Sequence, residues 1–205
     1  MKRIGILMVA LVLGLSSMTA QEATKILDKT AATLKAAKNV KIGFTLEADG
    51  GGNTAGNTGY IKLSGQKFVV NMGGSITWFD GKTMWSYVKK NEEVNVTTPT
   101  AAEVAKMNPY AFLSFYKKGY TAKMGKSTAK EHEVVLTGSE GSAYEQVVMR
   151  VNKATNEPTY LKTTSAKGVV TVIRCNSLVK NQKYTDATFR FNKKNYPKAE
   201  VVDLR

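Results

Sequence analysis

A long series of short strand-like segments limits how this 205-residue chain can fold more than any other feature. Within each segment, apolar or aromatic residues alternate with more polar ones, which is the pattern of a strand with one buried face. The turns carry Gly-Gly, Asp-Gly or Ser-Gly-Gln, because glycine allows the positive φ angles of tight hairpins. Strands that follow one another through short turns predict an antiparallel meander, which at about eleven strands must curl or close. The predicted strands are 40–48, 59–63, 67–72, 75–79, 83–88, 93–97, 120–124, 131–138, 144–152, 158–165 and 169–179, and Phe189 and Phe191 alternate in the same way before the C-terminal tail.

Two stretches with helical patterns break this series. In residues 22–40, apolar residues recur every three or four positions and lysines fall on the opposite side, which predicts an amphipathic helix. Near the middle of the chain, Thr100 and Glu103 have the spacing of a capping box, and Asn108 followed by Pro109 is typical of a helix start. The fold class predicted from these patterns is mainly β with helices, that is α+β.

The first twenty residues have the layout of a secretory signal peptide. A positive start at Lys2 and Arg3 precedes an apolar stretch over 4–15 and small residues that end at Ala20. A membrane anchor is the weaker interpretation, because a spanning helix needs ~20 apolar residues. The only cysteine, Cys175, lies far from this segment and cannot carry a lipid at the signal's end. We therefore expect cleavage near Ala20, a single domain over 21–205, and a soluble protein in the periplasm.

The charge balance favours anionic partners. The chain has 30 basic and 16 acidic residues, a net charge of +14, and 28 against 16, or +12, without Lys2 and Arg3. Transient contact with an anionic membrane fits this charge better than nucleic acid does, because the lysines are scattered. The alternative that the charge only keeps the protein soluble stays open.

Residues that could support catalysis or bind a metal or cofactor are scarce. His132 is the only histidine and lies between two glutamates in a predicted strand, and no spacing of potential metal ligands accompanies it or Cys175. Neither a strained nucleophile turn nor a glycine-rich phosphate loop before a helix is present. Cys175 is expected to be a buried structural thiol. The sequence therefore predicts a binding protein, with no catalytic residue, cofactor or metal.

An antiparallel sheet that curls turns one face inward, and that face can either fill with side chains or line a cavity for a ligand. The methionines favour a cavity slightly, because they repack around variable apolar cargo. An ordinary core is an equally good interpretation for any single residue. The predicted inward set is Ile42, Phe44, Leu46, Phe68, Val70, Met72, Trp85, Tyr87, Val94, Val96, Phe189 and Phe191.

Two segments resemble the LolA family of periplasmic lipoprotein carriers. The stretch "WFDGKTMWSYVKKNEEVNV", residues 78–96, is similar to that family's apolar-x-D-G-K-T-aromatic-aromatic pattern followed by an acidic-x-V strand. The end of the chain, "TDATFRFNKKNYPKAEVVDLR", is similar to its closing F-x-F strand and V-x-D tail. The order of the first helix, first strand and the "NPYAFL" helix also matches, so that the resemblance covers essentially the whole chain after the signal.

The resemblance implies an incomplete eleven-stranded antiparallel barrel with a helical lid over an apolar cavity for acyl chains. It implies a chaperone that takes acylated lipoproteins from an inner-membrane lipoprotein-releasing ABC transporter to an outer-membrane receptor, and acts as a monomer. Under this interpretation the inward set binds acyl chains, and a charge at Phe68 or Trp85 should weaken cargo binding. The family's arginine before the third strand, which helps its lid close, is replaced here by Gly65 and Gln66, so that either another donor such as Lys67 substitutes or the cavity opens differently. The lid residues are Leu27, Leu34, Met107, Phe112 and Phe115.

Three other functions fit parts of the sequence. A lipid-anchored receptor with the same fold would need a cysteine at the end of its signal. A lipid- or amphiphile-sensing envelope protein could use the same open barrel, although such proteins usually carry a second domain. A lipid-modifying enzyme would depend on His132.

Overall fold

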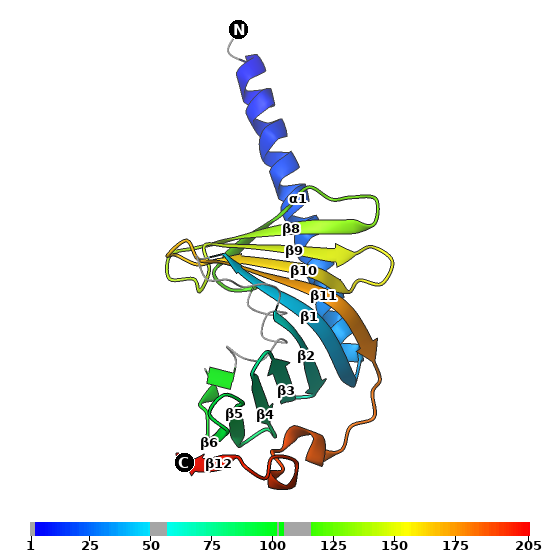
Figure 1. Ribbon diagram of the computed structural model, residues 1–205. Helices are drawn as coiled ribbons and strands as arrows, with labels where there is room; N and C mark the ends of the chain where they lie inside the picture. Colours follow the sequence, from blue (N-terminus) through cyan, green and yellow to red (C-terminus); the bar gives the residue numbers. More distant parts are fainter. Residues whose placement is uncertain (1–2, 50–56, 102, 105–115) are drawn as a thin grey trace. The chain divides into compact units, whose positions relative to one another are not determined.

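The computed structural model describes residues 3–49, 57–101, 103–104 and 116–205 (Figure 1). One long helix, α1 (Arg3–Ala36), leads directly into the first strand. Several predicted strands, including residues 67–72 and 131–138, have the predicted bounds. The strands are β1 (Asn39–Asp49), β2 (Asn57–Ser64), β3 (Lys67–Met72), β4 (Ser75–Phe79), β5 (Met84–Val88), β6 (Glu93–Thr97), β7 (Tyr120–Met124), β8 (Glu131–Gly138), β9 (Gln146–Asn152), β10 (Pro158–Thr164), β11 (Val170–Lys180) and β12 (Glu200–Asp203).

The strands form one twelve-stranded sheet in the order β12-β6-β5-β4-β3-β2-β1-β11-β10-β9-β8-β7. Strands β1 to β6 follow one another in the sheet as they do in the chain, as do β7 to β11, and these two series meet where β1 lies next to β11. The sheet is not closed, because β12 and β7 stand at opposite ends of this order. The prediction of a mainly β chain with helices and an unclosed antiparallel sheet is confirmed.

The end of the chain differs from the prediction. Phe189 does not belong to a strand but ends a short 3-10 helix, η2 (Asp186–Phe189). A second turn of the same kind, η3 (Lys193–Asn195), precedes β12, which adds to β6 in parallel. The prediction of a strand through Phe189 and Phe191 was wrong because two aromatic residues spaced two apart can reach one face from a turn as well as from a strand.

The chain divides into two compact units, which are described separately. Unit 1 contains α1 up to Thr33 and strands β7 to β10. The apolar side of α1 packs against β8 and β9, and this contact forms the core of the unit. Within the helix, the Thr30 hydroxyl donates a hydrogen bond of 3.0 Å to the Ile26 carbonyl, which lets a polar residue be fully buried there. The core residues of unit 1 are Ala23, Ile26, Leu27, Tyr116, Val134, Leu136, Val147, Met149 and Val151.

Unit 2 contains β1 to β6, β12, the two 3-10 helices and most of β11. Its part of the sheet is packed on both faces, so that it has apolar clusters on opposite sides of the same strands. At the start of the helical insert, the backbone N–H of Thr100 donates to Glu103 Oε2 over 2.8 Å and the Glu103 N–H donates to Thr100 Oγ1 over 3.3 Å. The predicted capping box is therefore confirmed, whereas Asn108 and Pro109 lie outside the described residues.

No helix in the described part of the chain is long and apolar enough to cross a membrane.

Candidate functional site

The register of the strands in unit 2 assigns each side chain to one of two faces, because paired residues point the same way. One face, here called the Phe68 face, contains the rows Ile42–Ile61–Val70 and Val40–Leu63–Phe68–Phe79–Met84. The other, here called the Trp78 face, contains the rows Lys62–Val69–Trp78–Trp85–Val96 and Gly43–Tyr60–Asn71–Ile76–Tyr87–Val94.

The Phe68 face combines a packed centre with a more accessible apolar margin. Phe68 is fully buried, and its ring centroid lies 5.2 Å from that of Phe79. Ile61 and Val70 pack against this cluster but remain only half-buried, and Met72 follows them on the same face with intermediate exposure. An apolar ligand laid along β2 and β3 would meet these side chains and no charged group of the same rows. The buried cluster consists of Ala37, Val40, Ile42, Leu63, Phe68, Phe79 and Met84.

Phe44 and Gly59 shape one end of this face. A Cβ at Gly59 would lie 2.8 Å from Phe44 Cζ and 2.4 Å from the Asn71 carbonyl oxygen. Because Gly59 has no side chain, the Phe44 ring lies down against β2 and is only 5% exposed. Phe44 therefore extends the apolar surface of the Phe68 face across β2.

The Trp78 face is covered by the C-terminal segment. Phe191 and Tyr196 lie over Trp78 with ring centroids 5.8 Å and 5.5 Å away, and Tyr196 also lies 4.8 Å from Tyr87. Phe189 is buried against the same surface at 1% exposure. This face is thus a second hydrophobic core that holds the end of the chain.

The prediction that twelve residues share one inward face is therefore wrong. Six lie on the Phe68 face and six belong to the Trp78 face and its cover. Strands β4 and β5 are apolar on both sides because each side is packed, and such strands lose the alternation that would reveal which side a residue faces. The first group is Ile42, Phe44, Leu46, Phe68, Val70 and Met72, and the second is Trp85, Tyr87, Val94, Val96, Phe189 and Phe191.

The Asp-Gly-Lys-Thr segment forms the turn between β4 and β5. The Asp80 carboxylate accepts hydrogen bonds from the backbone N–H groups of Lys82 and Thr83, over 3.0 Å and 2.9 Å, and Gly81 has a φ of +101°. Arg190 binds the same carboxylate over 3.0 Å. Burial works to raise the pKa of Asp80, but the two N–H donors and Arg190 outweigh it, so that the pKa is lowered. The segment is a structural turn that also anchors the C-terminal segment through Arg190, a partner that the sequence alone did not indicate.

Lys67, one candidate to substitute for the family's arginine, pairs with a residue near the end of the chain. It points to the opposite side of β3 from Phe68, and its ammonium binds the Asp186 carboxylate over 2.6 Å. Gly65 occupies the preceding turn with a φ of +57°. The Lys67 ammonium is therefore bound to η2.

Among the predicted lid residues, two belong to α1. Leu27 is buried in the core of unit 1 against β8 and β9, and Leu34 is 4% exposed. Met107, Phe112 and Phe115 lie outside the described residues. Directly after the insert, the Tyr116 hydroxyl donates to Asp28 on α1 over 2.6 Å, and the Lys117 ammonium lies 3.0 Å from the same carboxylate. This connection, which sequence reasoning missed, ties the end of the insert to α1.

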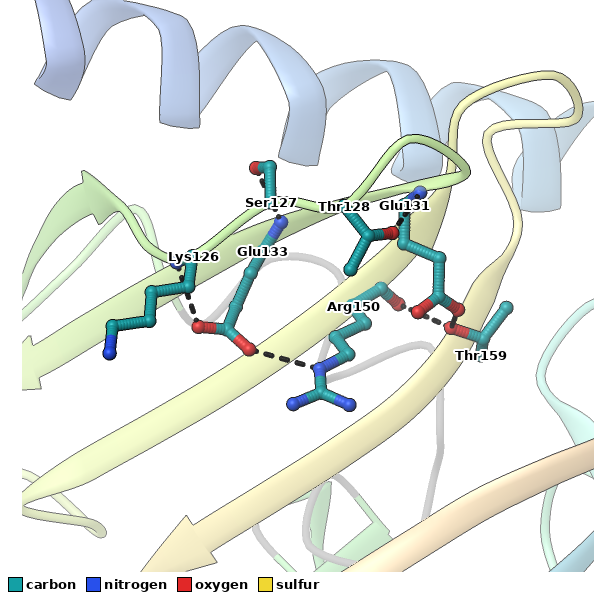
Figure 2. Close-up of polar contacts among 7 residues, drawn as sticks. All are labelled: Lys126, Ser127, Thr128, Glu131, Glu133, Arg150 and Thr159. Carbon is teal, nitrogen blue, oxygen red and sulfur yellow. Dashed lines mark hydrogen bonds and ion pairs between the residues drawn. The ribbon is translucent and has the colours of Figure 1, made fainter.

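Two glutamates of unit 1 connect neighbouring strands through hydrogen bonds. Figure 2 shows Glu133 between two donors: its carboxylate accepts from Arg150 Nε over 2.9 Å and from the Lys126 N–H over 3.0 Å. In the same view, Thr159 donates to Glu131 over 2.6 Å. These carboxylates connect β8, β9, β10 and the turn before β8, and both have partners that hold them in place.

Burial shifts the pKa of both His132 and Cys175. His132 is half-buried in β8, and burial followed by the charge of Lys153 lowers its pKa, although Glu22 acts in the opposite direction. Cys175 is half-buried and not fully buried as expected, and burial raises its pKa to about 11 where it packs against the cluster around Phe68. No group of three or more histidine, cysteine or acidic side chains suited to a metal occurs within residues 3–49, 57–101, 103–104 and 116–205.

The structure is similar to several solved proteins at low sequence identity. An uncharacterized conserved protein from Thermus thermophilus has a TM-score of 0.59 and 15% identity, over 89% of this chain and 99% of that one. A putative outer membrane lipoprotein-sorting protein domain from Vibrio parahaemolyticus has a TM-score of 0.46 and 13% identity, over 87% and 99%. A LolA superfamily protein from Nitrosomonas europaea has a TM-score of 0.40 and 13% identity, over 82% and 97%.

No relative with a curated description matches the chain in sequence. The model of one protein family does match, over residues 13–167, which is well over half of the chain. These residues include α1 from its first third onward and strands β1 to β10. The chain therefore belongs to the family described as outer membrane lipoprotein carrier protein LolA.

Proposed function

We propose that this protein is a periplasmic chaperone that binds the acyl chains of lipoproteins and carries them from the inner to the outer membrane. The observation that carries the proposal is the apolar margin of the Phe68 face, where Ile61, Val70 and Met72 remain half-buried beside a packed core. Family membership adds support, because the family's description is that of a lipoprotein carrier.

The physical requirement is a shelter for acyl chains in water. Each CH₂ group moved from water to an apolar site gains ~0.8 kcal/mol, so that a lipid-anchored protein stays in its membrane unless another apolar surface replaces it. Contacts with side chains such as Ile61 and Met72 are not directional. A carrier that uses them can bind strongly enough to extract its cargo and still release it, because no specific polar bond has to break.

The partners follow from this role. The cargo is an acylated lipoprotein, its source an inner-membrane lipoprotein-releasing ABC transporter, and its destination an outer-membrane receptor. The role is one of binding, and it assigns no chemical step to His132. Phe68 supports the surface from beneath, since it is fully buried.

The test introduces a charge on the proposed surface and, as a control, on the opposite face of the same strand. Ile61→Glu places a carboxylate between Ile42 and Val70, whereas Thr58→Glu places one at an exposed position of β2 that pairs with Thr45. Each purified variant is incubated with lipid-charged spheroplasts, and the lipoprotein released into the soluble complex is quantified. We expect Ile61→Glu to lower release at least ~10-fold, because an unpaired charge among acyl chains costs several kcal/mol.

Thr58→Glu should release lipoprotein like the wild type. Equal release by Ile61→Glu, with its fold verified by circular dichroism, would exclude the Phe68 face as the binding surface. If the wild-type protein extracts no lipoprotein but retains another amphiphile in native mass spectrometry, the alternative of a lipid- or amphiphile-sensing envelope protein would replace the carrier. A charge at Phe68 or Trp85 is a poorer test, because both side chains support cores of the fold.

A further inference from the structure

The part of the Trp78 face nearest β11 is polar and borders the aromatic cluster, since the Lys62 ammonium lies 5.9 Å from the centroid of the Tyr184 ring. Here Lys41 and Lys62 stand directly opposite each other on β1 and β2, and Gly43 stands opposite Tyr60. On the other side of Gly43, β11 contributes Ser177. We call this group of five residues, from three neighbouring strands of unit 2, the Gly43 cradle.

Gly43 lets the Ser177 side chain lie against β1 in the middle of the cradle. A Cβ at this position would lie 2.6 Å from Ser177 Oγ, so that the serine side chain fills the space that a larger residue would need. Gly43 does not have a positive φ, so that this close approach, and not its backbone conformation, accounts for the glycine. The Ser177 side chain is exposed and makes no hydrogen bond to any residue of the described chain.

The two lysines bring like charges close together on neighbouring strands. Like charges directly opposite each other across two strands repel. The ammonium groups of Lys41 and Lys62 lie 5.2 Å and 5.5 Å from the centroid of the Tyr60 ring, which offsets part of this repulsion. Neither lysine pairs with a carboxylate of the described residues, although the nearby cations Lys67 and Arg174 do, with Asp186 and Glu47.

We propose that the Gly43 cradle binds a phosphate group of the kind carried by anionic phospholipid headgroups and by free phosphate. The two ammonium groups supply the charge, the Ser177 hydroxyl donates a hydrogen bond, and Gly43 allows that hydroxyl to lie close to β1. Lysine binds phosphate as a point charge and needs no planar partner, whereas arginine binds phosphate and carboxylate alike through its planar fork. The proposal does not depend on the carrier function, since it concerns the opposite face of the sheet.

The test compares two pairs of substitutions that remove the same charge. Lys41→Gln/Lys62→Gln alters the cradle, and Lys89→Gln/Lys90→Gln alters two exposed lysines of the turn between β5 and β6. Binding of the full chain is measured by co-sedimentation with vesicles of phosphatidylglycerol and phosphatidylcholine, with vesicles of phosphatidylcholine alone as background. We expect the cradle pair to weaken binding about 10-fold more than the control pair. Equal weakening by the two pairs, or no binding by the wild type to either vesicles or inorganic phosphate, would overturn the proposal.

A second variant tests the Ser177 hydroxyl without any change of charge. Ser177→Ala removes this hydroxyl at an exposed position and creates no clash with Gly43. It should weaken binding several-fold, and binding at the wild-type level would overturn the role of the hydroxyl. A parallel titration with inorganic phosphate separates the sources. If inorganic phosphate binds to the wild type and the Lys41→Gln/Lys62→Gln variant does not bind it, free phosphate is a ligand. If only vesicles bind, and the same variant weakens that binding, the ligand is a headgroup in a bilayer.

Discussion

Removal of the Tyr116 hydroxyl should destabilise unit 1 by about 1–1.5 kcal/mol. The hydroxyl donates to the Asp28 carboxylate over 2.6 Å, and hydrogen bonds to charged groups contribute ~1.5–3 kcal/mol. The lower end applies, because the Asp28 side chain is 50% exposed and water can partly replace the donor. Tyr116→Phe keeps the ring, which is 5% exposed in the core, so that the change isolates the hydroxyl.

Lys117→Gln provides the matched comparison. Its ammonium binds the same carboxylate over 3.0 Å, but it is 58% exposed, and exposed ion pairs contribute less than ~1 kcal/mol. A double-mutant cycle of Tyr116→Phe with Asp28→Asn should give a coupling energy of at least ~1 kcal/mol. Urea unfolding is followed by circular dichroism, because Trp78 and Trp85 both lie in unit 2 and their fluorescence reports that unit.

The pH dependence gives an independent check. The hydrogen bond from Tyr116, and then the one from Lys117, hold the pKa of Asp28 below its usual value of 3.8. A carboxyl group whose pKa is lowered on folding stabilises the protein above the unfolded pKa, and this contribution disappears as the pH falls through the folded pKa. The difference between wild type and Tyr116→Phe should therefore be constant above pH 3.8 and shrink below it. A coupling energy below ~0.3 kcal/mol, or a larger loss from Lys117→Gln than from Tyr116→Phe, would refute the reasoning.

Three other changes test the structural assignments. Asp80→Ala should cost ~2–4 kcal/mol in urea unfolding, since it removes two turn hydrogen bonds and leaves Arg190 without its partner. Asp203→Ala at the exposed C-terminus should have a much smaller effect, and similar losses from the two substitutions would contradict the role of the turn. Cys175 has a pKa of about 11 in the folded protein, against 9.0 for a free thiol, and should therefore react with a thiol reagent at least ~100-fold more slowly than in the urea-unfolded chain. Equal reaction rates would show that the thiol is accessible and ionised in the folded protein. Trp85→Ala should lower the free energy of unfolding by ~2–3 kcal/mol and leave lipoprotein release by the folded protein unchanged. A loss of release without a loss of stability would show that Trp85 belongs to the binding surface.

The strands that have a turn glycine at each end could be predicted almost completely. The strand Lys67–Met72 lies between Gly65 and Gly73, and both glycines adopt the positive φ that its flanking hairpins need. Local turn chemistry and alternation give the same bounds here, and no distant contact is needed to explain them. The same reasoning explains why the Thr100–Glu103 capping box was recognisable, since both of its hydrogen bonds lie within four residues.

Features that depend on distant segments could not be predicted. β12 pairs in parallel with β6, which lies far away in the sequence, and a four-residue strand with a charge at each end carries too little pattern to reveal a partner. The bond from Tyr116 to Asp28 spans 88 positions and gives no local signal either. The face of the sheet that Trp85 occupies could not be predicted either. Its face is apolar because Phe191 and Tyr196, from the distant C-terminal segment, cover it.

The segment that carries the family resemblance and the surface proposed to bind acyl chains have separate roles. Asp80 forms a tight turn and holds Arg190, and Trp78 and Trp85 pack under the C-terminal segment, so that this motif stabilises the fold on one face of the sheet. The half-buried apolar residues such as Ile61 lie on the other face. A related chain could therefore keep the motif and lose its cargo, or change the Phe68 face and keep the fold. Recognition of the motif indicates the architecture, and the choice of ligand has to be tested at the side chains around Ile61.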